Sequence, residues 1–101
     1  TASSQRSTMP QVMSETVTKM AMSSFPNPFR SSNTISFSLE NAGYTNLAVF
    51  DITGKQVAVL VNGHLSSGHH RAIFSTPVPA GIYLLKLVHE GRVITEKIIK
   101  E

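Results

Sequence analysis

The chain has 101 residues and a mass of 11.0 kDa, enough for one domain, and its 41% hydrophobic and 15% charged residues exclude disorder throughout. No run approaches the roughly 20 apolar residues of a transmembrane helix, and the absence of cysteine excludes disulfides, thiolate metal sites and cysteine nucleophiles. The net charge of +3 comes with nine basic residues spread almost evenly along the chain, whereas nucleic-acid binders cluster such residues, so we expect a solvated surface and no nucleic-acid partner.

The first part of the chain differs in composition from the rest. Ten of the first 24 residues are Ser or Thr, and all seven aromatic residues lie from Phe25 onward. Such a stretch buries too little apolar surface to offset its ordering entropy. We therefore predict a Ser/Thr-rich flexible linker over residues 1–16, without the apolar segment of a signal peptide, and a folded domain over residues 17–101. Residues 17–24 predict a first strand, with a short helix from Ser14 as the alternative.

The next part of the chain has the pattern of an all-β domain. Pro26 and Pro28 disfavour a helix and hold the residues before them extended. Residues 34–39 alternate between apolar and polar side chains, which predicts a half-buried strand. After a turn at residues 41–43, residues 45–52 form the next predicted strand.

Tight turns separate the strands that follow. A hairpin connection is predicted where Asp51 can bond the amides of the turn and Gly54 can adopt a positive φ. Residues 57–61 then alternate as a strand, and we expect the chain to turn at Asn62-Gly63 and again at residues 66–68.

The C-terminal part contains the most apolar segment, residues 82–89, which we expect to be a central strand covered on both faces. A strand over residues 69–75 precedes it, and a tight turn at Glu90-Gly91 leads into a last strand over residues 93–100. Short strands at a spacing of roughly 8–12 residues, with no alternating helices, predict an immunoglobulin-like antiparallel β-sandwich of about seven strands.

No catalytic or metal-binding constellation stands out. A serine, a histidine and Asp51 can be assembled on paper, but Asp51 belongs to a hairpin and the nucleophile-elbow signature is absent. Adjacent His69 and His70 point to opposite faces of a strand, and we expect His64 and His89 at the solvent edge. The other carboxylates are expected to be solvated: Glu40, Glu90 and Glu96. We therefore expect no enzymatic activity, no cofactor and no small-molecule substrate.

Five short motifs follow one another along the chain. They are Phe-Pro-Asn-Pro-Phe at 25–29, the strand at 33–39, the strand and turn at 47–57, Gly-Ile-Tyr at 81–83 and Glu-Lys-Ile-Ile-Lys at 96–100. In this order they resemble the type A C-terminal sorting domain of bacterial type IX secretion cargo, the Por secretion family, over roughly residues 17–101. The motif residues, and the candidates for recognition by the export machinery, are Pro26, Asn27, Pro28, Asp51, Gly54, Gly81, Tyr83, Lys97, Ile98 and Lys100.

Each motif also has a physical interpretation that needs no export machinery. The two prolines cannot donate to a strand ladder, which suits the edge of a sheet. Gly81 allows a bend or a close approach, and Tyr83 can bury its ring while its hydroxyl stays bonded. Any immunoglobulin-like sandwich could use these residues, so the order of the motifs carries the resemblance.

The resemblance has departures and alternatives. Phe74 stands about where relatives often have Trp, and residues 77–80 replace an Asn-Leu pair. The strand and turn at 49–54 also resemble the immunoglobulin-like domain of flagellar hook-capping proteins. A structural or adhesive module of a secreted enzyme is a further alternative. Sugar-binding faces present exposed aromatic residues, and Tyr44 and Phe29 are the only candidates for exposure.

The resemblance implies a sorting signal that follows an N-terminal cargo domain. It implies passage through the periplasm, recognition by the type IX translocon, and removal by a sortase-like surface protease before Phe25, with the cargo anchored at the cell surface or released. We expect the hairpin of residues 81–100 to be recognised. We expect its last strand to be an edge strand that carries Arg92, Lys97 and Lys100. These residues suit binding of an acidic partner or strand addition, which includes a homodimer. Alternatively, they protect the edge from aggregation.

Overall fold

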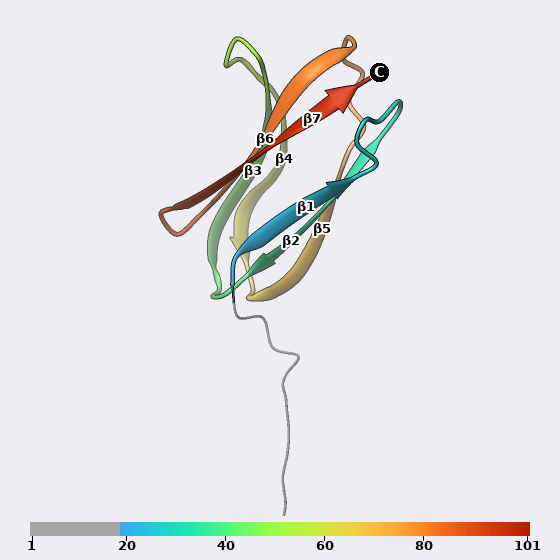
Figure 1. The fold of residues 1–101 in the computed structure, drawn as a ribbon. Coiled ribbons are helices and arrows are strands. Elements are labelled where there is room, and N and C mark those ends of the chain that lie inside the picture. Colours follow the sequence, from blue (N-terminus) through green and yellow to red (C-terminus); the bar gives the residue numbers. More distant parts are fainter. Residues whose placement is uncertain (1–18) are drawn as a thin grey trace, which may run out of the picture.

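The computed structural model describes residues 19–101, and this part of the chain consists of strands, turns and loops (Figure 1). The predicted linker, most of the alternative helix from Ser14, and the start of the predicted first strand lie outside the described residues. No helix long and apolar enough to span a membrane occurs within residues 19–101. The seven strands are β1 (Ala21–Phe25), β2 (Asn33–Leu39), β3 (Gly43–Asp51), β4 (Gln56–Leu65), β5 (Gly68–Phe74), β6 (Gly81–His89) and β7 (Arg92–Lys100).

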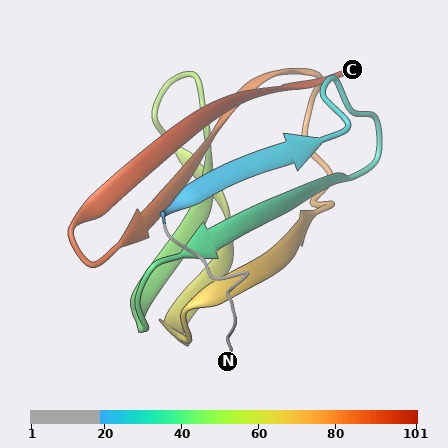
Figure 2. The ribbon, with the colours of Figure 1, turned by 60° about the horizontal axis from the view of Figure 1, so that its bottom comes forward.

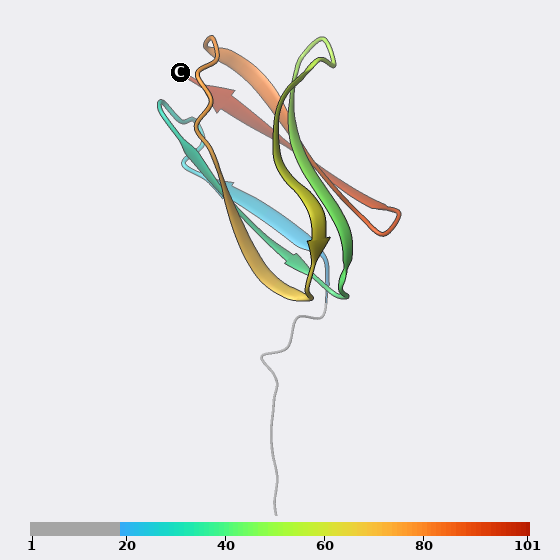
Figure 3. The ribbon, with the colours of Figure 1, turned by 180° about the vertical axis from the view of Figure 1, so that it is seen from behind.

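The strands form two sheets that pack as layers, as Figures 2 and 3 show from two sides. One sheet has three strands in the order β1-β2-β5, and the other has four in the order β4-β3-β6-β7. Every neighbouring pair of strands is antiparallel. The predicted antiparallel β-sandwich of about seven strands is therefore confirmed. β1 and β7 are edge strands of different sheets that contact each other across the layers.

The core lies between the sheets and follows the period-two pattern of the strands. Alternate side chains point inward from each sheet and fill the space between the layers. Three of the buried aromatic rings gather at one end, where the ring of Phe74 packs against Phe29 at 5.8 Å and against Tyr83 at 6.4 Å between centroids. The larger aliphatic residues of this core are fully enclosed: Ile35, Leu39, Leu47, Val49, Leu85, Leu87 and Ile98.

Strand β6 is central in its sheet but is covered on one face only. Leu85 and Leu87 are completely buried, whereas the outward Ile82 and Leu84 are 43% and 36% exposed. The expectation that both faces are covered is therefore wrong. The strand is central because it bonds β3 on one side and β7 on the other, and that in-plane position adds no third layer above the antiparallel sheet.

The Asn62-Gly63 turn predicted from sequence is also wrong, because β4 runs straight through it. Asn62 pairs with Asn46 and Gly63 pairs with Thr45 in a ladder that follows β3 to its start. This ladder satisfies the backbone of β4, so tertiary pairing overrides the local preference of the dipeptide for a turn. The predicted turn at Glu90-Gly91 is confirmed, with positive φ angles of 48° and 80° that suit a two-residue hairpin.

Phe29 is buried, contrary to the expectation that it is a candidate for exposure. It is 2% exposed and closes the aromatic end of the core, whereas Tyr44 is 53% exposed as expected. The aromatic residue that faces solvent beside the prolines is Phe25, at 56%. Phe25 ends a strand with its side chain on the outer face, and the segment of residues 26–28 then returns the chain over the open end of the sandwich.

The one-sided burial of β6 gives a direct test by substitution. Leu85→Ala is expected to lower the free energy of unfolding by about 2–5 kcal/mol, because it leaves a cavity between the sheets. Leu84→Ala, one residue away on the outer face, is expected to change it by less than about 1 kcal/mol. Urea-induced unfolding of the two variants measures both values. Equal losses would show that the outer face of β6 is covered after all.

Candidate functional site

The Pro-Asn-Pro motif lies against the outer edge of the last strand. The side-chain amide of Asn27 makes two hydrogen bonds with the backbone of β7: Nδ2 donates to the carbonyl of Lys97 at 3.1 Å, and Oδ1 accepts from the N–H of Ile99 at 3.0 Å. The amide thus occupies the position that a neighbouring strand would take. We call residues 26–29, which carry this pairing, the strap.

The backbone of Phe29 also bonds to the outer edge of β7. Its N–H donates to the carbonyl of Ile99 at 2.9 Å, and its carbonyl accepts from the N–H of Glu101 at 2.8 Å, which forms a parallel bridge to Lys100. Three backbone groups on the outer edge of β7 and the N–H of Glu101 just after it therefore have partners. The C-terminal half of this edge is closed, and an edge in that state does not pair with another chain.

The residue types of the strap fit this role. Proline has no N–H, so Pro26 and Pro28 cannot offer a donor to β7, and the asparagine between them supplies a donor and an acceptor from its side chain. Both proline peptide bonds are cis. The carbonyl of Pro26 accepts from the side chain of Asn33 at 2.7 Å, and Asn33 is fully buried at the start of β2. The strap is therefore bonded to the three-stranded sheet at one end and to the four-stranded sheet at the other.

The Gly-Ile-Tyr motif and the last strand face each other at this end of the sandwich. Tyr83 and Ile98 are cross-strand partners, and both are buried. The ring of Tyr83 is 5% exposed while its hydroxyl donates to the carbonyl of Pro79 at 2.6 Å, as predicted from its residue type. Gly81 pairs with Lys100 and has a φ of 153°, which side-chain-bearing residues rarely adopt.

The Asp51 turn joins the same end of the four-stranded sheet, because Asp51 is the partner of Tyr83 on the side away from β7. Asp51 Oδ1 accepts from the N–H and hydroxyl of Thr53 at 2.9 Å and 2.6 Å and from the N–H of Lys55 at 3.1 Å. Gly54 completes the turn with a φ of 89°. These contacts lower the pKa of Asp51 from 3.8, and the hydrogen bond from the Thr53 hydroxyl is the main cause. The two backbone amides and the charge of Lys55 add to the lowering, whereas desolvation opposes it.

The structure thus brings all ten candidate residues to one end of the sandwich. Asp51, Tyr83 and Ile98 form one row across β3, β6 and β7, and the strap closes that row at the outer edge. Sequence reasoning missed the pairing that joins the first motif to the last, which spans 72 residues between Asn27 and Ile99. The sequence signal for this pairing is Asn27 itself, which stands between two prolines that have no N–H to donate to a strand ladder.

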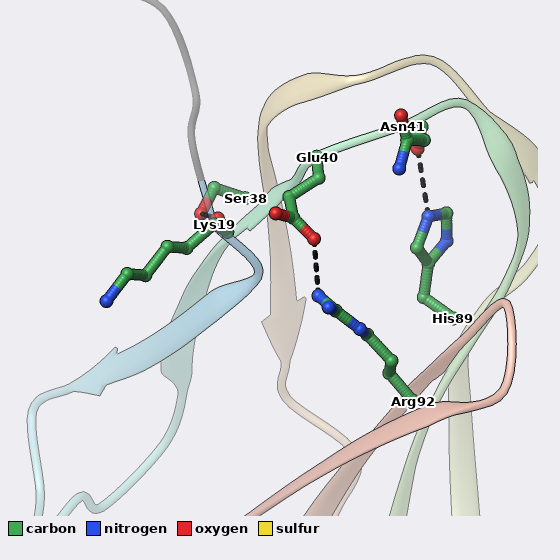
Figure 4. Close-up of polar contacts among 6 residues, drawn as sticks. All are labelled: Lys19, Ser38, Glu40, Asn41, His89 and Arg92. Atoms are coloured by element: carbon green, nitrogen blue, oxygen red, sulfur yellow. Dashed lines mark hydrogen bonds and ion pairs between the residues drawn. The ribbon is translucent and has the colours of Figure 1, made fainter.

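The opposite end of the sandwich is polar (Figure 4). His89 is 3% exposed, and its ring nitrogens contact the Thr45 hydroxyl and the Asn41 carbonyl, each at 2.8 Å. The expectation of a solvent-edge His89 is therefore wrong, because the alternation of β6 points its last residue inward. Arg92, a cation of the last hairpin, forms an ion pair with Glu40. Among residues 19–101, no group of three or more metal-ligating side chains comes together.

The strap predicts a specific loss of stability. Asn27→Ala removes both side-chain bonds to β7 and is expected to lower the free energy of unfolding by about 1–2 kcal/mol. Asn62→Ala is the matched control, because this exposed asparagine bonds only the exposed side chain of Tyr44. Chemical denaturation compares the two variants. If Asn27→Ala costs no more stability than Asn62→Ala, the strap does not hold the strand.

The turn predicts a pH dependence. Because the folded-state pKa of Asp51 lies below 3.8, its ionised carboxylate stabilises the fold above that pH, and this contribution is lost as the pH falls below it through the folded-state pKa. Asp51→Asn removes the charge but keeps an acceptor, so wild type is expected to be the more stable at neutral pH. The difference should shrink in acid, as thermal unfolding across pH measures. A difference that stays constant down to the lowest pH would contradict this assignment.

Comparison with known proteins agrees with the motif order. No curated protein matches the chain. The sequence model of the family described as "secretion system C-terminal sorting domain" matches residues 23–101. This range begins in β1 and includes the strap, the Asp51 turn, the Gly-Ile-Tyr strand and all of β7. The chain belongs to this family, the sorting domains of type IX secretion.

Proposed function

We propose that this domain directs an N-terminal cargo through the periplasm to the type IX translocon, which recognises the domain in its folded state. Family membership supports the coarser part of this proposal, a sorting tail on an exported cargo that reaches the cell surface or the medium. The observation that carries the finer part is the gathering of all ten motif residues at one end of the sandwich. Motif residues so far apart in sequence form a single feature only after folding.

The closed edge of β7 favours recognition through side chains. Strand addition needs free backbone N–H and carbonyl groups, and the strap occupies those of Ile99 and the carbonyl of Lys97. A homodimer through this half of the strand would have to displace Asn27. Of the three basic residues in the last strand, Arg92 is already paired with Glu40, while Lys97 is exposed.

Removal of the domain by a sortase-like surface protease is the second part of the proposal. Proteases require an extended and accessible chain. All five residues of β1 pair with β2, from Ala21 with Ser38 to Phe25 with Thr34. A cut within β1 would require unpairing the strand, so we place the cut N-terminal to Ala21.

The alternative of a sugar-binding or structural module has less support. Stacking on a sugar ring uses aromatic side chains that lie side by side on one face. The exposed Phe25 belongs to the three-stranded sheet and the exposed Tyr44 to the four-stranded sheet. A scaffold role of the hook-cap kind stays an untested prediction.

A secretion assay tests the sorting role. A Sec signal and a fluorescent reporter are fused ahead of residues 1–101 and expressed in a bacterium with a working type IX system and in its translocon-null mutant. We expect reporter outside the first strain and in the periplasm of the second, with a released C-terminus N-terminal to Ala21. The same fusion without residues 19–101 is the control and should stay inside both strains. Retention of the complete, folded fusion in both strains would refute the proposal.

A further inference from the structure

The outer faces of the two sheets differ in character. On the three-stranded sheet the outward positions include a polar row, Ser23, Ser36 and Arg71, and beside it a row with two exposed apolar residues, Phe25 and Ile73. On the four-stranded sheet the outward positions of three strands are mainly apolar. We call the face defined by Phe50, Ile82, Leu84, Lys86, Lys97 and Ile99 the lysine face. Contiguous apolar surface of this kind on a small domain marks an interaction site.

The side chains of the lysine face lie next to one another. Phe50 and Leu84 are cross-strand partners, and Leu84 is in turn the partner of Lys97. Ile82 and Ile99 form the next pair, with 43% and 37% of their surface exposed. Lys86 Nζ lies 5.9 Å from the centroid of the Phe50 ring, and the two residues line a shallow hollow together with Leu84. The face is therefore continuous across β3, β6 and β7.

The charge on this face has one sign. Within residues 43–51, 81–89 and 92–100, no carboxylate occupies an outward position of the sheet body. Contrary to the expectation that it is solvated, Glu96 points between the sheets, where it accepts a hydrogen bond from the Ser24 hydroxyl. Asp51 lies in the turn at the margin, with its carboxylate bonded to Thr53 and Lys55. Lys86 and Lys97 are left as exposed cations set among apolar side chains.

We propose that the lysine face is the docking surface for a protein partner that presents apolar side chains with carboxylates between them. This inference rests on the proposed function, in which that partner belongs to the export machinery. Charge complementarity selects an acidic partner, because each lysine gains an opposite charge while the apolar groups around it are buried. The strap lies along the edge of this face and holds Lys97 and Ile99 in register beside Leu84 and Ile82.

Two other occupants fit the face less well. A second copy of the chain would bring lysines against lysines, and like charges in an interface oppose association. A lipid surface takes up elements whose apolar side chains are segregated from their charges. Here Lys86 lies between Leu84 and Val88 on the same face of β6, so insertion into acyl chains would carry the charge with it.

The test uses the reporter fusion with the complete chain and two matched double variants. Leu84→Ser/Lys86→Glu changes an apolar residue and a cation on the lysine face, and Ile73→Ser/Arg71→Glu makes the same changes on the exposed outer face of β5. We expect the first to lower the translocon-dependent secreted fraction at least about tenfold. The second is expected to stay within about twofold of wild type. Circular dichroism checks folding, and Lys86→Glu alone, an exposed charge change, serves if the double variant unfolds.

Each contrary outcome overturns a different statement. Equal secretion of the lysine-face variant and wild type would overturn the lysine face while leaving the sorting role intact. Retention of the wild-type fusion in the type IX strain would refute the sorting role itself and this inference with it. Analytical ultracentrifugation showing a wild-type dimer that Leu84→Ser/Lys86→Glu abolishes would reassign the face to a second copy. Flotation with anionic phospholipid vesicles that the same variant abolishes would reassign it to lipid.

Discussion

The pairing of the Asn27 side chain with the backbone of β7 is the interaction on which the rest of this structure depends. A two-layer sandwich leaves edge strands with free backbone groups, and such edges invite pairing with other chains. Here the segment that leaves the first strand crosses to the other sheet, and one amide satisfies the carbonyl of Lys97 and the N–H of Ile99. The first and last described parts of the domain are therefore joined, and the end of β7 becomes part of the core, with Ile98 fully buried.

This arrangement explains why the residues of the family motifs are also residues that the fold needs at this end of the sandwich. The turn at Asp51, the ring of Tyr83 and the side chain of Ile98 form one row that ends at the strap. Tyr83 and Ile98 are buried in this end of the sandwich, and the side chains of Asn27 and Asp51 are engaged in hydrogen bonds there. The groups free to make contacts lie on the neighbouring outer face, where Lys86 and Lys97 stand among apolar side chains. Most of the motif residues thus hold this surface in place, and Lys97, itself a motif residue, supplies its chemistry together with Lys86.

The strands and several turns could be predicted because their signals are local. Alternation over residues 34–39 and the Glu90-Gly91 turn depend on neighbours in sequence, and both are confirmed. The failures at Asn62-Gly63 and at Phe29 involve partners far along the chain. Asn62-Gly63 stays extended because β3 lies beside it, and Phe29 is buried because Phe74 receives it. No local pattern shows that an amide at position 27 pairs with a strand 70 residues later.

Hydrogen exchange along β7 tests the closed edge most directly. Because Ile99 bonds to the strap, its N–H and carbonyl point away from β6, toward the free edge of the sheet. The N–H groups of Val93 and Thr95 point to the same edge, because the direction alternates along a strand, but the strap does not reach them. We expect the Ile99 amide to be protected nearly as well as the amides bonded to β6, and the amides of Val93 and Thr95 to exchange much faster. An Ile99 amide that exchanges as fast as Thr95 would show that the edge is open and would contradict the role given to Asn27.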